Sequence, residues 1–231
     1  TAAALLATGV LFSATSTLAQ NWPTRPVRMI VPFAAGGGTD IQARLFATKL
    51  TPALGQTMIV DNRPGAGGNI GAELVAKSPP DGYTVLFQSA SLAVNQTLYS
   101  KLNYSATRDL APVMLVSSTP LIFVVHPSVP AKTVKDVITL AKARPGIFNF
   151  GSNSTGTTSH LSAELFKTMT GTKMTHVPYK GAGQSVVALA SGEIDMLFTT
   201  VLAALPHVKS GRMRALAVTT LKRAPSLPDL P

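Results

Sequence analysis

The chain has 231 residues, of which 45% are hydrophobic and 13% are charged. This composition provides a buried core for one large or two small domains and excludes a disordered chain. The net charge is +10, but the basic residues are scattered singly and do not alternate with aromatic residues, so we expect no nucleic-acid partner. The lack of cysteine excludes disulfides, thiolate catalysis and cysteine-bound zinc.

The first residues have the pattern of part of a secretory signal peptide. An apolar stretch at residues 2–12 is followed by small and polar residues that end in Thr17-Leu18-Ala19. The apolar stretch is shorter than the roughly 20 residues that span a bilayer. We therefore expect residues 1–19 to be a partial signal peptide and the protein to be exported to the periplasm. An ordinary buried N-terminal helix is the alternative interpretation.

Strand-like and helix-like segments alternate along the rest of the chain, which predicts an α/β fold with mostly parallel strands. The expected strands are residues 27–31, 58–60, 83–87, 121–125, 148–150, 174–177, 194–198 and 215–219. The expected helices start at Thr39 or Asp40, cover residues 70–77, follow a capping box at Thr133 and Asp136, and include residues 161–169. A strand, a loop of small residues and a helix start follow one another after Val31 and again after Phe150.

The two loops in these repeated units are candidate anion sites. A helix N-terminus carries unpaired backbone N–H groups and a partial positive charge, both of which favour an anion. The loop at residues 32–40 offers N–H groups and one hydroxyl, and the loop at residues 152–159 offers many hydroxyls. Facing each other, the loops would form a neutral cage of donors for a carboxylate. Each loop alone is better explained as an ordinary turn, because Gly and Ser are common turn residues.

Enzyme motifs are incomplete. Ile41 stands where a dinucleotide-binding motif starting in residues 36–38 needs its third glycine, and neither a phosphate-binding P-loop nor a G-x-S-x-G motif occurs. The four histidines lack metal-binding spacing, so we expect no metal and no cofactor. A triad of Ser159, His160 and Asp195 would need a nucleophile elbow and an oxyanion site, which no motif predicts.

Residues 22–40, WPTRPVRMIVPFAAGGGTD, resemble the opening of the tripartite tricarboxylate transporter receptors, the Bug-type periplasmic binding proteins. The resemblance continues at residues 54–56, 62–71, 80–84, 177–181 and 215–219. It covers essentially all of residues 22–231. The ordered set of segments is much more specific than either glycine-rich loop alone.

The resemblance implies a type II periplasmic-binding-protein fold, in which two α/β lobes close on a ligand in the cleft between them. We expect lobe 1 to comprise residues 20–118 and 221–231, and lobe 2 to comprise residues 119–220. Family members continue beyond the motif at residues 227–231, so we expect the C-terminal part of lobe 1 to be missing. Expressed as written, such a chain should aggregate or unfold at low temperature.

The resemblance also places the carboxylate of the ligand between the two loops. The expected ligand-binding residues are Phe33, Ala34, Ala35, Gly36, Gly37, Gly38, Thr39, Asp40, Ser89, Ser91, Ser152, Ser154, Thr155, Gly156, Thr157, His160 and Asp195. Family members often carry glycine at the position of Ser154 and asparagine at that of Thr155, so the donors of the second loop differ here. Asp195 is equally compatible with a structural cap, because an acidic residue beside an anion needs a special reason.

The function that follows is a periplasmic solute-binding receptor. We expect it to capture a small carboxylate by a hinge motion of the lobes and to deliver it, as a monomer, to membrane transporter subunits. Two alternatives stay open: a periplasmic hydrolase, and a ligand sensor for a signalling partner. A panel of generic esters tests the first alternative, and a pull-down with membrane partners tests the second.

Overall fold

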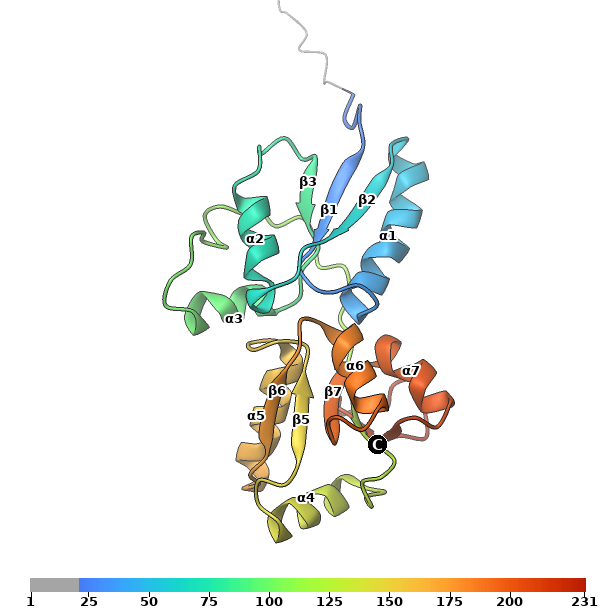
Figure 1. Ribbon diagram of the computed structural model, residues 1–231. Helices are drawn as coiled ribbons and strands as arrows, with labels where there is room; N and C mark the ends of the chain where they lie inside the picture. Colours follow the sequence, from blue (N-terminus) through green and yellow to red (C-terminus); the bar gives the residue numbers. More distant parts are fainter. Residues whose placement is uncertain (1–20) are drawn as a thin grey trace, which may run out of the picture.

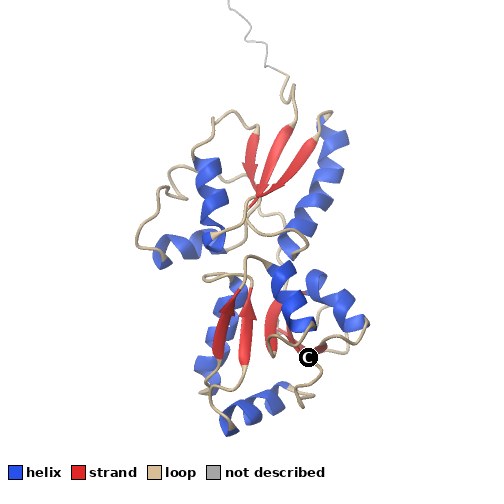
Figure 2. Cartoon of the chain, viewed as in Figure 1, coloured by secondary structure: helices blue, strands red, loops and turns tan. Residues whose placement is uncertain are grey.

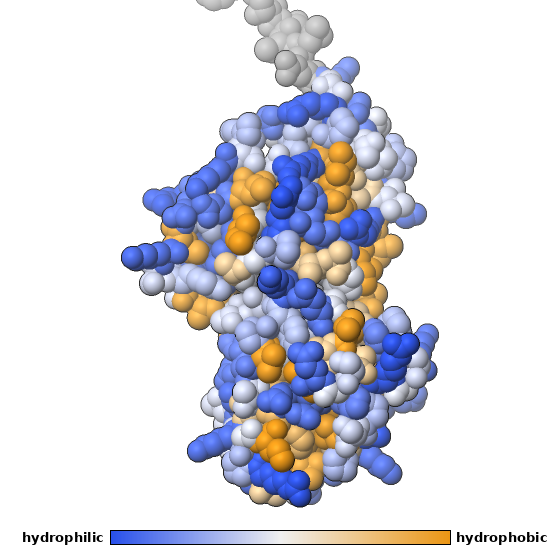
Figure 3. Space-filling model, in the orientation of Figure 1, coloured by the Kyte–Doolittle hydropathy of each residue, from blue (hydrophilic) through white to orange (hydrophobic). Residues whose placement is uncertain are grey.

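The computed structural model describes residues 21–231, which form two α/β lobes stacked end to end (Figure 1). The expected partial signal peptide at residues 1–19 lies outside the described residues. None of the helices within residues 21–231 combines the length and the apolar character needed to cross a membrane. The surface narrows to a waist where the lobes meet, and its apolar patches are scattered among hydrophilic residues (Figure 3).

Lobe 1 contains a parallel three-stranded sheet with the strand order β2-β1-β3. Its elements are β1 (Val27–Val31), α1 (Gly38–Leu54), β2 (Met58–Asn62), the 3₁₀ turn η1 (Ala66–Gly68), α2 (Asn69–Ala76), β3 (Thr84–Leu86) and α3 (Ser91–Leu98). The central strand β1 is apolar and almost wholly buried, as expected for a strand covered on both faces. Its side chains pack against Ala43 and Ala47 of α1, which positions the start of that helix at the end of β1.

Lobe 2 contains a five-stranded sheet with the order β6-β5-β7-β4-β8. Figure 2 shows strands of this lobe in red with helices in blue around them. Its elements are β4 (Leu121–Val125), α4 (Val134–Ala143), β5 (Asn149–Ser152), α5 (Thr158–Thr170), β6 (Thr175–Pro178), α6 (Ala182–Ala190), β7 (Met196–Thr200), α7 (Val201–Lys209) and β8 (Arg214–Val218). Strand β5 is parallel to β6 and β7, whereas β4 is antiparallel to β7 and β8. The expectation of mostly parallel strands is therefore correct for lobe 1 and for only part of lobe 2.

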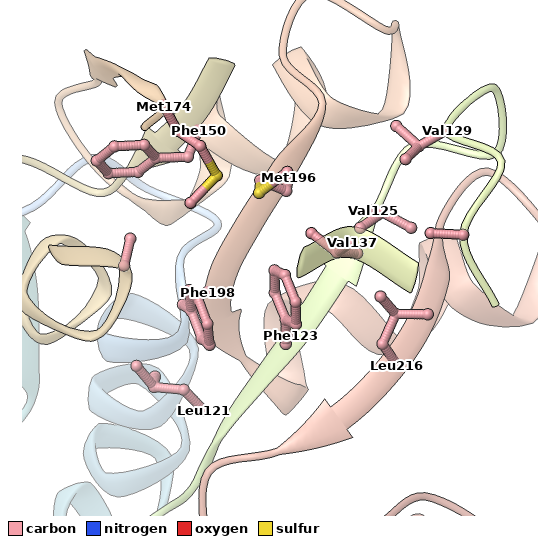
Figure 4. Packing of buried hydrophobic residues seen from close by; sticks show 12 residues of the cluster. Leu121, Phe123, Val125, Val129, Val137, Phe150, Met174, Met196, Phe198 and Leu216 are labelled. Atoms are coloured by element: carbon pink, nitrogen blue, oxygen red, sulfur yellow. The ribbon is translucent and has the colours of Figure 1, made fainter. Parts of the chain in front are cut away.

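Successive side chains of β4 point to opposite faces of this sheet and so contribute to two separate cores. Phe123 belongs to the cluster under α4 and α5, where its ring stacks on Phe198 with 4.4 Å between centroids (Figure 4). Ile122 and Val124 belong to the cluster under α6 and α7. The sheet is thus covered by helices on both faces, the arrangement of an α/β layer fold.

The lobe boundary lies beside the start of β4 and the end of β8. Thr219 donates its backbone N–H to the carbonyl of Leu121 (2.9 Å), and the N–H of Leu121 donates to the hydroxyl of Thr219 (3.0 Å). Residues 221–231 then return to lobe 2, where Leu227 and Leu230 pack against the cluster under α6 and α7. The expected assignment of residues 221–231 to lobe 1 is therefore wrong for this chain, because these two leucines find their apolar partners in lobe 2.

The helix starts agree with the sequence predictions at α4 but not at α1. The capping box is confirmed, since Asp136 donates its backbone N–H to Thr133 Oγ1 (3.1 Å) and its carboxylate accepts from the N–H of Thr133 (2.9 Å). The expected cap of α1 at Thr39 or Asp40 is wrong. The cap is Gly37, which has extended backbone angles and makes no side-chain capping bond. The sequence interpretation also did not identify α3, α6 and α7.

Candidate functional site

A cleft of about 790 Å³ lies between the lobes and takes residues from both. Its polar lining residues are Thr39, Gln42, Gln88, Ser89, Ser117, Ser118, Thr119, Asn153, Thr157, Thr158, Ser162, Thr200 and Thr219. Apolar lining comes from side chains such as Phe33, Leu92 and Leu115. Within residues 21–231, the lining of this cleft contains no charged side chain. An ion bound here would therefore meet only hydroxyl, amide and backbone groups.

Five helices begin at the cleft. Each contributes a lining residue at its N-terminal end: Gly38 of α1, Ala90 of α3, Thr157 of α5, Ala182 of α6 and Thr200 of α7. None of the five cap residues makes a side-chain capping bond. At α3, however, Ser89 accepts the N–H of Ser91 on its hydroxyl (3.4 Å) and the N–H of Leu92 on its carbonyl (3.2 Å), so the free N–H groups belong mainly to the other four helices. Each N-terminus carries roughly half a positive charge. The convergence of these ends favours an anion in the cleft without any basic side chain.

Some residues of the first loop line the cleft, and others contact lobe 2. Phe33, Gly37, Gly38 and Thr39, four of the residues expected to bind the ligand, line the cleft. The expected ligand contacts at Ala34, Ala35 and Gly36 are not part of the lining. This stretch turns toward lobe 2, and Ala34 donates its backbone N–H to the carbonyl of Lys180 (3.2 Å). These three residues therefore serve the contact between lobes.

Asp40 braces the first loop and does not face the cleft. Its buried carboxylate, 3% exposed, accepts hydrogen bonds from the N–H of Gly36 (2.9 Å), from Arg44 (3.0 Å) and from the amide of Asn62 (2.9 Å). Burial raises the pKa of Asp40, but these hydrogen bonds outweigh burial and hold the pKa below its usual 3.8. The ligand-binding role expected for Asp40 is therefore corrected to a structural one, since its charge is already paired.

The second loop brings fewer of its expected residues to the cleft. Thr157 lines the cleft, but Ser154 and Thr155 do not, and Ser154 uses its carbonyl to accept the hydroxyl of Thr157 (2.7 Å). Thr155 lies against lobe 1, with its carbonyl facing Gly67. Gly156 donates its N–H to His160 Nδ1 (3.3 Å), which keeps both residues out of the lining.

Two histidines pack beneath the second loop. His160 of α5 stacks on His176 of β6 with 4.2 Å between ring centroids, and His176 Nε2 lies 2.7 Å from the hydroxyl of buried Ser152. The pKa of His176 is lowered from 6.5 to about 4, mainly by burial, with the neighbouring His160 and Lys167 acting in the same direction and Glu164 opposing them. Ser152 and His160, both expected in the cleft, therefore support the loop from below.

Not all of the expected site residues outside the two loops line the cleft. Ser89 lines the cleft, whereas Ser91 is fully buried behind it with its hydroxyl 3.0 Å from that of Ser89. Asp195 precedes β7, at the opposite end of that strand from Thr200, and its carboxylate accepts the N–H of Asn149 (2.7 Å). Asp195 therefore does not line this cleft, and its bond to Asn149 is of the kind that the alternative interpretation, a structural cap, requires.

Several lining residues were absent from the predicted site. Gln88 follows β3 and Thr200 ends β7, and both carry a buried polar atom without a hydrogen-bond partner. Asn153 stands inside the second loop and also lines the cleft. The signal that identifies such residues is their place at the carboxyl end of a parallel strand, where ligands collect in α/β sheets. Among residues 21–231, no cluster of three or more acidic or histidine side chains is placed to hold a metal ion.

Comparison with known proteins gives the family. Residues 42–231 match the tripartite tricarboxylate transporter family receptor. Protein BugT of Bordetella pertussis is 41% identical over 234 aligned residues, which cover 98% of this chain and 72% of that protein. The UPF0065 protein in the tcbD-tcbE intergenic region of Pseudomonas sp. strain P51 is 37% identical and is covered to 65% of its length. The chain thus spans about two thirds of these curated relatives.

Solved structures agree with the sequence relatives. The structure of R. palustris Rpa4515 with adipate has a TM-score of 0.89 and 43% identity, and the aligned part is 91% of this chain and 71% of that one. MatC from Rhodopseudomonas palustris with bound malate has a TM-score of 0.83 and 30% identity, over 91% of this chain and 72% of that one. Both have the two-lobed periplasmic-binding-protein fold seen here. The chain belongs to the tripartite tricarboxylate transporter receptor family.

Proposed function

We propose that this protein is a periplasmic receptor that captures a small carboxylate and delivers it to a membrane transporter of the tripartite tricarboxylate type. The observation that carries the proposal is the uncharged cleft at which five helices begin. Helix N-termini supply N–H donors and positive potential, which match a carboxylate and offer nothing comparable to a neutral ligand. Adipate and malate, the ligands named with two related structures, belong to this chemical class.

The distribution of the lining residues between the lobes supports capture by closure. Gly38 and Ser89 come from lobe 1, whereas Thr157 and Thr200 come from lobe 2. A ligand that contacts both sets favours the arrangement in which the lobes touch, because only there are all of its hydrogen bonds made. Burying an anion without full pairing is costly, so both sets of donors are needed at once.

The cleft supports binding rather than catalysis. Within residues 21–231 no histidine and no carboxylate lines it, so its hydroxyl groups have no general base beside them. Two serines contact a histidine, Ser152 with His176 and Ser128 with His126, and neither serine lines the cleft. Ser152 is 0% exposed, which keeps it away from any substrate.

Calorimetry with adipate and with its uncharged diamide tests the proposal. The two compounds share their carbon chain, so a difference in affinity reports on the carboxylates alone. We expect adipate to bind at least tenfold more tightly than the diamide. Repetition with malate and its diamide extends the test to a shorter acid. Equal affinities for acid and amide in both pairs would contradict a site built for carboxylates.

Small-angle scattering tests the closure. The radius of gyration should decrease when a bound acid saturates the protein, because the lobes then spend more time in contact. An unchanged radius at saturation would argue against the hinge motion. Delivery is a separate question, and a pull-down of the membrane subunits with the acid-loaded protein addresses it.

A further inference from the structure

Beside the cleft, the two lobes meet at a backbone-to-backbone contact. The lobe 1 side is residues 34–36 and the lobe 2 side is residues 180–183, and we call these two segments together the latch. Ala34 donates its backbone N–H to the carbonyl of Lys180 across it (3.2 Å). Figure 1 shows the N-terminal end of α6 directly beneath the loop that precedes α1. The contact therefore lies beside the cleft, whose lining includes Ala182.

Two glycines make this approach possible. A Cβ atom at Gly183 would lie 2.6 Å from the carbonyl oxygen of Ala35, and a Cβ atom at Gly181 would lie 2.8 Å from the backbone nitrogen of Ala34. Real Cβ atoms essentially never come closer than 3.0 Å to another heavy atom. Both obstructing atoms are backbone, which cannot move aside as the end of a flexible side chain can. A side chain at either position would force the lobes apart.

Lobe 2 by itself does not need glycine at position 183. Gly183 lies in the first turn of α6 and has no positive φ, so its conformation suits alanine, which is the better helix former. The nearest non-local atoms to a Cβ there, and to one at Gly181, all belong to lobe 1. The requirement for glycine at position 183 thus comes from the arrangement in which the lobes touch.

We infer that Gly181 and Gly183 set the affinity for the ligand without contacting it, by permitting the lobes to close. This inference rests on the proposed binding function. When binding requires the closed arrangement, any change that makes closing less favourable weakens the apparent affinity by the same factor. Neither glycine lines the cleft, so a loss of affinity on substitution cannot come from a lost contact with the ligand.

The test compares Gly183→Ala with the unmodified chain by calorimetry with adipate. We expect at least tenfold weaker binding and a melting temperature of the unliganded protein that is no lower, because alanine suits the helix. Gly181→Ala should show the same loss of affinity. Val187→Ala is the matched control, since Val187 is exposed on the same helix and should leave the affinity unchanged. Unchanged affinity in both glycine variants would overturn the inference.

A second measurement tests the role of the latch in lobe closure without depending on which ligand the protein binds. The chain contains no cysteine, so Lys49→Cys on α1 and Lys142→Cys on α4 provide two labelling sites, one in each lobe. Energy transfer between dyes at these sites reports lobe closure without any ligand. We expect Gly183→Ala to lower the transfer in the unliganded protein. If adipate fails to bind but this shift occurs, the latch stands and the proposed ligand class fails. An unchanged transfer together with unchanged affinity refutes the latch.

Discussion

His176 should make the stability of the protein depend on pH between about 4 and 7. The imidazole packs against Phe150 and His160, with centroids 4.8 Å and 4.2 Å away, and its Nε2 contacts Ser152 Oγ. Burial is the main cause that lowers the pKa of His176 from 6.5 to about 4, and the proximity of His160 and Lys167 acts in the same direction. Glu164 raises the pKa of His176, but its side chain is 40% exposed and does not cancel the lowering.

The sign and size of the effect follow from linkage. A histidine whose folded pKa is depressed contributes its full stability above the unfolded value of 6.5, and this stability is lost as the pH falls through 6.5 toward 4. The depression is about 2.5 units, from 6.5 to about 4, and each unit corresponds to about 1.36 kcal/mol. The upper bound is therefore about 3 kcal/mol below pH 4, and partial exposure of the ring reduces the loss expected at pH 5 to about 1–2 kcal/mol.

Urea unfolding at pH 7 and pH 5 measures this loss. His176→Gln retains a partner for Ser152 and removes the titrating ring, so the variant should lose about 1–2 kcal/mol less than the unmodified chain between the two pH values. Thr175→Gln, at an exposed neighbour on β6, is the control and should keep the original pH response. An NMR titration in which the His176 ring protonates near pH 6.5 would refute the reasoning, as would an identical pH response of His176→Gln.

Two further changes separate structural roles from ligand contact. Asp40→Asn should lower the free energy of unfolding by about 1–3 kcal/mol and weaken adipate binding, because the N–H groups of Gly36 and Arg44 lose a charged acceptor. Urea unfolding and calorimetry measure the two effects. Full adipate affinity in the variant would contradict the role of Asp40 in holding the first loop in place. Asp195→Ala should lower the free energy of unfolding by about 1–2 kcal/mol, because the hydrogen bond to the N–H of Asn149 is lost, and should leave the adipate affinity unchanged. Weaker adipate binding by calorimetry would instead show that Asp195 contributes to the binding site.

The strands were predictable because burial dictates their composition. The run VRMIV is apolar enough to be recognised as β1, and its predicted bounds, residues 27–31, agree with the structure. The same holds for β4 at residues 121–125. Helix α4 was predictable for a second reason, since its capping box and its apolar face at Val137 and Ala141 are both local patterns. Local sequence patterns of this kind can be recognised without knowing which distant elements pack against them.

The site was only partly predictable, because the direction of each loop side chain depends on contacts with distant elements. Asp40 and Thr39 are adjacent in the sequence, yet Asn62 of β2 draws the carboxylate of Asp40 away from the cleft while Thr39 lines it. Asp195 was misplaced because a sequence pattern does not say which end of β7 faces lobe 1. Thr200, at the other end of that strand, is the residue that reaches the cleft.

The run Gly36-Gly37-Gly38 illustrates how one motif can combine different physical requirements. Gly36 has a φ of +79° with open space around it, so its requirement is conformational. A Cβ atom at Gly38 would instead collide with the side chain of Thr200 in lobe 2, and one at Gly37 would lie 3.2 Å from Ala182. The glycines thus serve a backbone conformation at Gly36 and the approach of the lobes at Gly37 and Gly38.

These two requirements predict opposite behaviour for two alanine variants. Gly36→Ala should lower the stability of the unliganded protein by about 1–2 kcal/mol, since alanine resists a left-handed conformation whether the lobes are open or closed. Gly38→Ala should leave that stability unchanged, because separated lobes remove the collision with Thr200, and should weaken adipate binding at least tenfold. Thermal unfolding without ligand, paired with calorimetry, distinguishes the two. If Gly38→Ala instead destabilised the unliganded protein as much as Gly36→Ala does, the glycine at position 38 would be required within lobe 1, and its assignment to lobe closure would fail.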